Sequence, residues 1–102
     1  MKKQRFDVLQ LEHLNQYVII VNDEIIFKSY DSLIASYNQK KNKLVFDEDW
    51  DYSKTTLKHL YLFLQRYCID YHGIANALNS RNIKKSLAGL LKLNVIKKGC
   101  IA

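Results

Sequence analysis

The fold of this chain is decided by the stretch Trp50–Tyr71, which reads WDYSKTTLKHLYLFLQRYCIDY. Ser53 is placed to cap a helix, because its hydroxyl can accept a hydrogen bond from the otherwise unpaired backbone N–H of Thr56. Apolar residues then recur at helical intervals and form one face, while other apolar residues fall off this stripe. The stretch therefore predicts a main helix over 53–71 that is covered by more than one neighbour.

The residues before this helix predict an antiparallel sheet. Four apolar segments, separated by short polar turns, lie at 16–21, 24–29, 33–38 and 43–46. Residues 5–15 fit either an additional edge strand or a short helix. Because one apolar face of such a sheet must be covered, we expect an α+β fold in which one long helix covers a small antiparallel sheet of three to four strands.

The C-terminal part of the chain differs from the rest in charge. The chain has 102 residues and a net charge of +6, and residues 73–102 carry basic residues but no acidic one. The pattern there indicates a short helix over 74–78, a second helix over 82–93 and a closing segment at 95–99 that could be a short strand. We expect a single domain over 1–102, with the sheet and main helix in about 16–71 and a basic helical segment in about 73–102.

Two charged segments are candidate binding sites. Such a separation of charge points to nucleic acid or to an acidic protein surface as the partner. The basic residues are Arg81, Lys84, Lys85, Lys92, Lys97 and Lys98. An acidic loop before the main helix could imitate phosphates towards a partner, and its residues are Asp47, Glu48, Asp49 and Asp51.

Several classes of function are disfavoured by what the sequence lacks. No apolar run approaches the ~20 residues of a membrane span, and the N-terminus has no signal-peptide core, so we expect a cytoplasmic protein. Cys68 and Cys100 are too few and too isolated for a zinc site or a disulfide framework. Ser53 and His59 are not accompanied by a nucleophile elbow or an oxyanion-hole motif. We expect no enzymatic activity, no metal and no cofactor.

The sequence leaves more than one interpretation open for three features. The polar residues at the start of the main helix could bind an anion or could simply cap the helix, and they are Ser53, Thr55, Thr56, Lys58 and His59. Tyr30, Tyr37 and Tyr67 could belong to an interface or to the core. The apolar main helix could also support a homodimer.

Two runs of sequence carry a resemblance. They are SYDSLIASY at 29–37 and WDYSKTTLKH at 50–59, the latter followed by Phe63 and Leu64. With its Tyr-Ser-x-Thr-Thr-x-Lys-His motif, the chain resembles, over about 17–71, a family of small, mostly uncharacterised proteins encoded by phages and prophages of Gram-positive bacteria. The resemblance implies a mobile element in a bacterial host cell, and it implies no activity.

The first functional hypothesis is therefore a non-enzymatic binding protein from a phage or other mobile element. It would inhibit or modulate a host nucleoprotein machine, as anti-CRISPR and anti-defence proteins do, with a host protein or ribonucleoprotein complex such as a Cas effector as partner. The alternative is a helix-turn-helix-like DNA-binding transcriptional regulator that uses residues 74–98. In that motif the spacing is about two residues short, and Asn79 stands where a turn glycine is usual.

Overall fold

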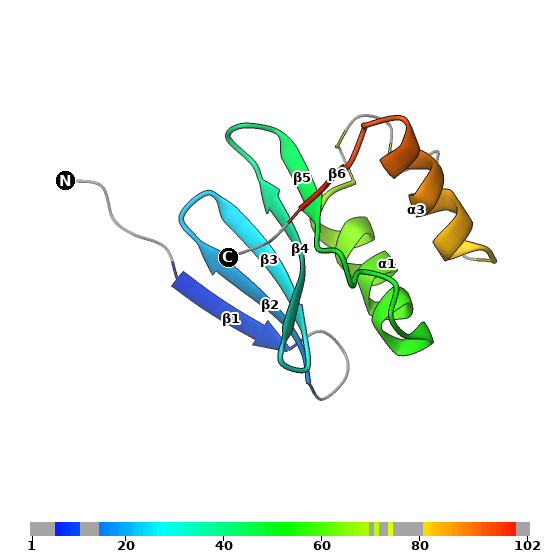
Figure 1. Ribbon diagram of the computed structural model, residues 1–102. Coiled ribbons are helices and arrows are strands. Elements are labelled where there is room, and N and C mark those ends of the chain that lie inside the picture. The colour runs from blue at the N-terminus through cyan, green and yellow to red at the C-terminus, as the bar shows by residue number, and fades with distance from the viewer. Residues whose placement is uncertain (1–5, 11–14, 70, 72–73, 75–80, 100–102) are drawn as a thin grey trace.

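The structure is a computed structural model that describes residues 6–10, 15–69, 71, 74 and 81–99. Among these residues, five strands precede one helix, and another helix and a short strand follow it (Figure 1). In chain order the elements are β1 (Phe6–Gln10), β2 (Gln16–Val21), β3 (Glu24–Ser29), β4 (Ser32–Asn38), β5 (Lys43–Phe46), α1 (Lys54–Tyr67), α3 (Ile83–Lys92) and β6 (Lys97–Lys98).

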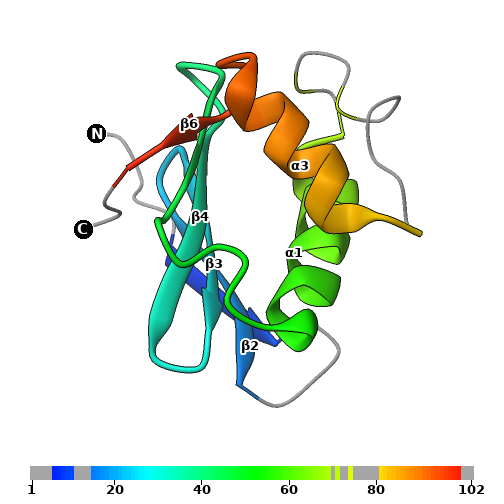
Figure 2. The ribbon, with the colours of Figure 1, turned by 45° about the vertical axis from the view of Figure 1, so that its right-hand side comes forward.

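The sheet is larger than the sequence pattern indicates. Its six strands lie in the order β1-β2-β3-β4-β5-β6, and all neighbours are antiparallel except β5 and β6, which are parallel. Both helices lie on the same side of this mixed sheet (Figure 2). The predicted α+β fold, a small antiparallel sheet of three to four strands covered by one long helix with an appended basic helical segment, is therefore wrong.

The error arises at the two edges of the sheet. β1 comes from the segment that fitted either a strand or a helix, and it extends the hairpins by placing Val8 opposite Ile19. β6 joins the sheet only because the chain returns from α3 to β5, where the N–H of Gly99 donates to the carbonyl of Phe46 at 2.9 Å. A short strand within 95–99 was one expectation, but no local signal shows that it pairs in parallel with β5 and enlarges the sheet.

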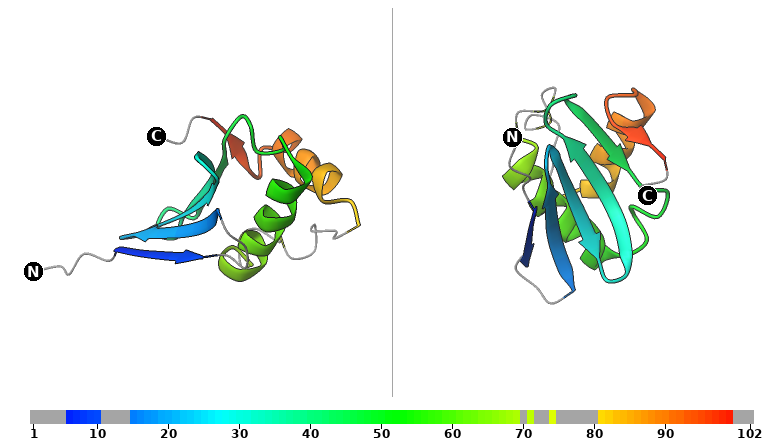
Figure 3. Two further views of the ribbon diagram at one scale, coloured as in Figure 1. Left: turned by 90° about the horizontal axis from the view of Figure 1, so that it is seen from below. Right: turned by 90° about the vertical axis from the view of Figure 1, so that its left-hand side faces the viewer.

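The inner face of the sheet packs against the helices (Figure 3). Along β2 and β3, buried residues alternate with less buried ones, so side chains point in turn to this face and to an outer face. A β-bulge in β4 interrupts the alternation, so that Ile34 and Ala35 are both buried. The largest fully buried apolar side chains are Phe27, Phe46, Phe63, Ile34, Leu44, Leu60, Leu64, Ile74, Leu87 and Ile96.

Helix α1 begins as the sequence predicts. Ser53 is its N-cap and accepts from the N–H of Thr56 at 3.1 Å. The helix ends at Tyr67, earlier than predicted, and its buried side includes Phe63, which stacks on Phe27 with ring centroids 5.7 Å apart. α3 provides the second neighbour that the apolar surface of this helix requires.

The C-terminal part belongs to the same core as the sheet. Leu87 of α3 and Ile96 before β6 are buried with the residues of the sheet, and the hydroxyl of Tyr71 donates to the carbonyl of Val95. The predicted helix over 74–78 lies, apart from Ile74, outside the described residues. Within the part of the chain that the structure describes, no helix is both long and apolar enough to cross a membrane.

Candidate nucleic-acid interface

A groove of about 250 Å³ lies where α1 and α3 begin. We call it the cationic groove, because four of its side chains are basic. It is lined by Lys54, Leu57 and Lys58 of α1 and by Arg81, Asn82, Ile83 and Lys84 around the start of α3.

The helical repeat explains why cations form the rim of this groove and apolar residues its floor. Lys54 and Lys58 are one helical turn apart, so they project from the same exposed side of α1. Leu57 and Ile83 are half-buried and pack against the core. The groove therefore offers an apolar surface surrounded by positive charge.

Both helices begin beside the groove, so the positive ends of their dipoles lie near it. Ser53 caps α1, and Asn82 caps α3 by accepting from the N–H of Lys85 at 3.4 Å. Neither helix has an acidic residue in its first turn, where negative charge is normally favourable. The lysines instead add positive charge to the positive dipole ends, so a bound anion would relieve repulsion at this place.

The acidic loop reaches the margin of the cationic groove. A carboxylate oxygen of Asp51 lies 3.4 Å from Nζ of Lys84, and these two side chains are 32% and 65% exposed. Ion pairs of this exposure contribute at most about 1 kcal/mol. An incoming phosphate can therefore compete with Asp51 for Lys84.

The remainder of the acidic loop is organised by its own backbone. Trp50 is buried, and its N–H donates to the carbonyl of Asp47 at 3.2 Å, while a carboxylate oxygen of Asp47 accepts from the N–H of Asp49 at 3.2 Å. Glu48 and Asp49 are exposed. The predicted acidic partner-binding loop thus stands beside the basic surface.

The six predicted basic residues do not form one surface. Only Arg81 and Lys84 line the cationic groove. Lys85 and Lys92 lie with Lys84 on an exposed face of α3 that spans roughly 100° of the helix. Lys97 is opposite the half-buried Val45 on the outer face of the sheet, and Lys98 is the next residue of the β6 edge.

Two basic residues of the groove were not among the residues predicted for the basic site. Lys54 is absent from the prediction, and Lys58 was assigned only to the polar cluster at the helix start. A signal was available, because two lysines one turn apart begin a helix that has no acidic residue in its first turn. Their proximity to Arg81, however, depends on how α1 packs against α3.

The other residues of that polar cluster mainly serve the structure. The hydroxyl of Ser53 donates to Oγ1 of the fully buried Thr56 at 3.0 Å, and Thr56 Oγ1 lies 3.0 Å from Oγ of Ser29. Nδ1 of the buried His59 lies 2.8 Å from the carbonyl oxygen of Thr55. Among the described residues, no group of three or more potential metal ligands occurs.

The three tyrosines for which the sequence allowed either an interface or a core position occupy different environments. Tyr37 is 8% exposed, packs edge-on against Tyr71 and donates to Oδ1 of Asn42 at 3.2 Å, so its place is in the core. Tyr67 is half-buried against Phe63. Tyr30 is exposed in the turn between β3 and β4 and is the one of the three that a partner can contact fully.

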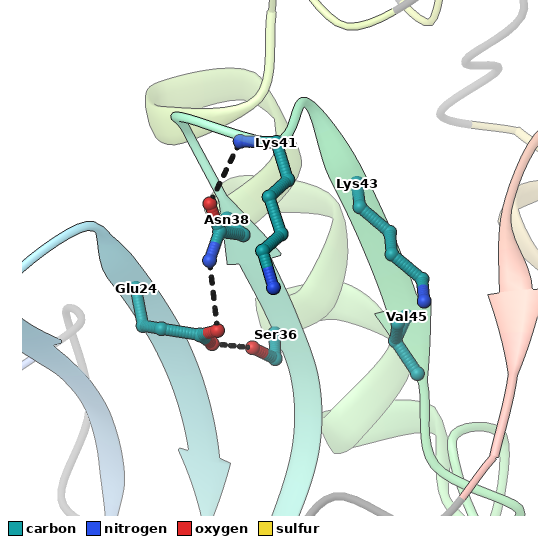
Figure 4. Close-up of a pocket in the computed structure, with 6 residues that line it drawn as sticks. All are labelled: Glu24, Ser36, Asn38, Lys41, Lys43 and Val45. Carbon is teal, nitrogen blue, oxygen red and sulfur yellow. Dashed lines mark hydrogen bonds between the residues drawn. The ribbon is translucent and has the colours of Figure 1, made fainter.

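A second depression, of about 180 Å³, lies on the outer face of the sheet (Figure 4). Its acidic residue, Glu24, accepts from the hydroxyl of Ser36 and from Nδ2 of Asn38, the latter at 3.1 Å. Lys41 and Lys43 line the same depression. Because the carboxylate at its centre repels anions and is already hydrogen-bonded, we interpret this cluster as a cross-strand network that stabilises β3 and β4.

The thiol of Cys68 is not available for chemistry. Its side chain is buried at the C-terminal end of α1, and this burial raises the pKa of the thiol far above its ordinary value. A reactive cysteine requires the thiolate form. Cys68 is therefore a small apolar residue of the core.

The comparisons with known proteins identify one family for this chain. Residues 7–75, more than half of the chain, match a family of unknown function (DUF8033). This range includes α1 and five strands of the sheet, but it ends before α3. No curated protein and no solved structure matches the chain.

Proposed function

We propose that this chain, which belongs to the family of unknown function DUF8033, is a non-enzymatic binding protein whose cationic groove engages nucleic-acid phosphates in a host nucleoprotein machine. The observation that carries the proposal is the convergence of two helix N-termini and four basic side chains over an apolar floor. Fixed N–H dipoles and cations at one place are a general means of binding phosphate.

The floor and rim of the groove suit different parts of a nucleotide. The basic side chains at the rim are positioned for phosphate oxygens, which supply most of the affinity of nucleic-acid binding. Leu57 and Ile83 provide an apolar contact for a sugar or a base. Phosphate contacts alone carry no sequence information, so we expect little sequence preference.

The two charged surfaces favour a partner that contains both protein and nucleic acid over bare nucleic acid. The acidic loop stands next to the groove, and the two meet at the ion pair between Asp51 and Lys84. A ribonucleoprotein presents both phosphates and basic protein surface, and it can therefore match both charges. With the resemblance to phage proteins, this supports an inhibitor or modulator of anti-CRISPR or anti-defence type that acts in the cytoplasm of a bacterial host cell.

The direct test is a titration of labelled single-stranded RNA and duplex DNA, followed by fluorescence anisotropy at several salt concentrations. The double variant Lys58→Glu/Arg81→Glu should lose at least about tenfold in affinity and should flatten the salt dependence, because each phosphate contact contributes roughly −0.9 to the slope on duplex DNA. Lys40→Glu/Lys43→Glu makes the same charge change at exposed positions outside the groove and should retain most of the affinity. Equal losses in both variants would show that only net charge matters and would refute a role for the groove.

The host partner is tested separately by capture from bacterial lysate. Tagged wild-type protein should retain a ribonucleoprotein in untreated lysate, and nuclease treatment or Lys58→Glu/Arg81→Glu should reduce the captured material. If wild type and Lys58→Glu/Arg81→Glu capture the same protein in equal amounts, and nuclease does not change the result, the phosphate-binding role is wrong. If wild type captures nothing at all, the proposal that the protein inhibits or modulates a nucleoprotein machine is wrong.

One observation favours a second function, a DNA-binding regulator that uses residues 74–98. The exposed face of α3 bears Lys84, Lys85 and Lys92, as a recognition helix in the major groove would. The helix that should precede it falls mostly outside the described residues. Lys85→Glu/Lys92→Glu separates the two functions: it should abolish duplex binding by a regulator but leave most binding through the cationic groove.

A further inference from the structure

The edge strand β1 exposes large apolar side chains along its whole length, which distinguishes it from the exposed but basic strand β6. All five of its residues are exposed, and three of them are large and apolar: Phe6 at 69%, Val8 at 52% and Leu9 at 45%. β1 lies on the side of the sheet away from α3, beyond the cover of the helices (Figures 1 and 3). Among the described strands only β2 pairs with it, so a row of its N–H and C=O groups faces outwards.

β1 lacks most of the features that usually protect a sheet edge, and its one charged residue is Asp7, opposite the buried Ile20. Natural edges are blunted by lysine, proline, bulges or very short strands, because an open apolar edge recruits further strands. β1 has five residues, pairs with β2 in unbroken register and contains neither lysine nor proline. The opposite edge shows the contrast, since β6 is two residues long and both residues are lysine.

We propose that β1 pairs antiparallel with β1 of a second copy of this chain, so that one continuous sheet runs through a two-fold symmetric dimer. The strand is self-complementary about its central residue. With Val8 opposite Val8 of the second copy, Phe6 faces Gln10 and Asp7 faces Leu9, so the register places no like charges directly opposite each other.

The short, basic edge strand β6 favours pairing of β1 with β1 over pairing of β1 with β6. Pairing of β1 with β6 of another copy would be head-to-tail and would propagate, but two lysines and a length of two residues disfavour it. Pairing of β1 with itself uses the same surface twice and stops at two copies. It also replaces the dimer through the main helix that the sequence suggested, because α1 is covered by β3 and α3.

The expected dimer is weak. A strand of five residues buries less than the about 1,000 Å² that a stable interface needs. We therefore expect an equilibrium between monomer and dimer in sedimentation experiments. The dimer fraction should rise as the protein concentration is increased about a hundredfold up to roughly millimolar.

The first experiment compares sedimentation of wild type, Val8→Lys and Leu93→Lys. Val8→Lys places two ammonium groups at the two-fold axis and should leave only monomer. Leu93→Lys makes the same change at a residue that is 73% exposed and distant from β1 in sequence, and it should dimerise like wild type. Circular dichroism verifies that each variant is folded.

The second experiment tests the register and does not depend on the stability of a lysine variant. In a Cys100→Ser background, Val8→Cys should form an intermolecular disulfide, because directly opposed Cα atoms in an antiparallel pair are about 4.5–5.5 Å apart. Leu9→Cys is the matched control: the two copies of this residue are two positions out of register and roughly 8 Å apart, too far to bridge. The buried Cys68 remains in both proteins.

Three results would overturn the proposal. They are a wild type that stays monomeric at the highest concentration, a Val8→Lys variant that dimerises like wild type, and equal crosslinking at positions 8 and 9. Each of these outcomes leaves the cationic groove unaffected, because the groove lies at α1 and α3 and contains no residue of β1.

Discussion

At the scale of single residues, a chain of three hydroxyl groups explains why Ser53 and Thr56 stand at the start of the main helix. Thr56 is fully buried and its hydroxyl contacts both Ser53, the cap of α1, and Ser29 at the end of β3. This short chain ties the start of the helix to the sheet. The two runs of sequence that carry the resemblance therefore meet at Ser29 and Thr56, and their contact is structural.

Replacement of Thr56 by valine should destabilise the fold. The buried hydroxyl of Ser29 then loses this partner, and such a loss costs about 1–3 kcal/mol. Ser29→Ala added to Thr56→Val should recover part of the loss, because an apolar pair leaves no buried donor. Urea denaturation of the double-mutant cycle measures this coupling. Thr55→Val is the exposed control and should change stability by less than about 0.5 kcal/mol; additive effects of the two buried changes would contradict the contact.

A second prediction at this scale concerns Cys68 and alkaline pH. Burial raises the pKa of its thiol in the folded protein, whereas the unfolded chain releases this proton near the ordinary value of 9.0. Above that pH the unfolded state loses a proton that the folded state keeps, so stability falls as pH rises. The slope for one such group is at most about 1.4 kcal/mol per pH unit.

The comparison that isolates this effect is Cys68→Ala. Other groups titrate at alkaline pH in both proteins, so the informative quantity is the difference between their free energies of unfolding as a function of pH. We expect this difference to be constant below about pH 8 and to shrink above about pH 9, because only wild type loses the contribution of the thiol. Parallel curves over the whole range would show that the thiol titrates alike in both states.

At the scale of elements, α3 is part of the core and not an appendage. Leu87 is fully buried beside residues of the sheet and α1. Leu87→Ala should therefore destabilise the whole protein by about 2–5 kcal/mol, with one unfolding transition by circular dichroism and by the fluorescence of Trp50. Leu93→Ala, at an exposed position just after α3, should cost less than about 0.5 kcal/mol. If Leu87→Ala produced a separate early transition, α3 would be an independent segment.

The sequence shows elements whose partners are close along the chain and misses those whose partners are distant. The hairpin strands β2 to β5 appear where apolar segments and polar turns indicated them, and the cap at Ser53 is confirmed. A short strand was one expectation for 95–99, where β6 lies, but its parallel pairing with β5 spans the whole of α1 and α3, so no local pattern indicates that pairing. The same reason applies to the site: Lys54 and Arg81 are far apart in sequence, and only helix packing places them around one groove.

At the scale of the whole molecule, the fold separates two surfaces of different physical character. The cationic groove lies at the starts of α1 and α3. The apolar strand β1 forms the edge of the sheet away from α3 (Figure 1). A dimer through β1 therefore leaves both grooves accessible. The two interactions should be separable by mutation: Val8→Lys should remove the dimer without reducing phosphate binding, and Lys58→Glu/Arg81→Glu should do the reverse.

Salt should act on these two surfaces in opposite directions. Binding in the cationic groove releases counterions, so its affinity should fall steeply as salt rises from about 50 to about 200 mM. Pairing through β1 brings together two chains that each carry a net charge of +6, and the basic residues Lys2, Lys3 and Arg5 precede the strand in sequence. Screening weakens that repulsion and leaves the apolar contact of Phe6, Val8 and Leu9, so the dimer should strengthen over the same range. Anisotropy and sedimentation on one protein preparation measure both trends. If dimerisation weakened with salt in parallel with phosphate binding, the contact between copies would be electrostatic, and the apolar edge of β1 would not be its cause.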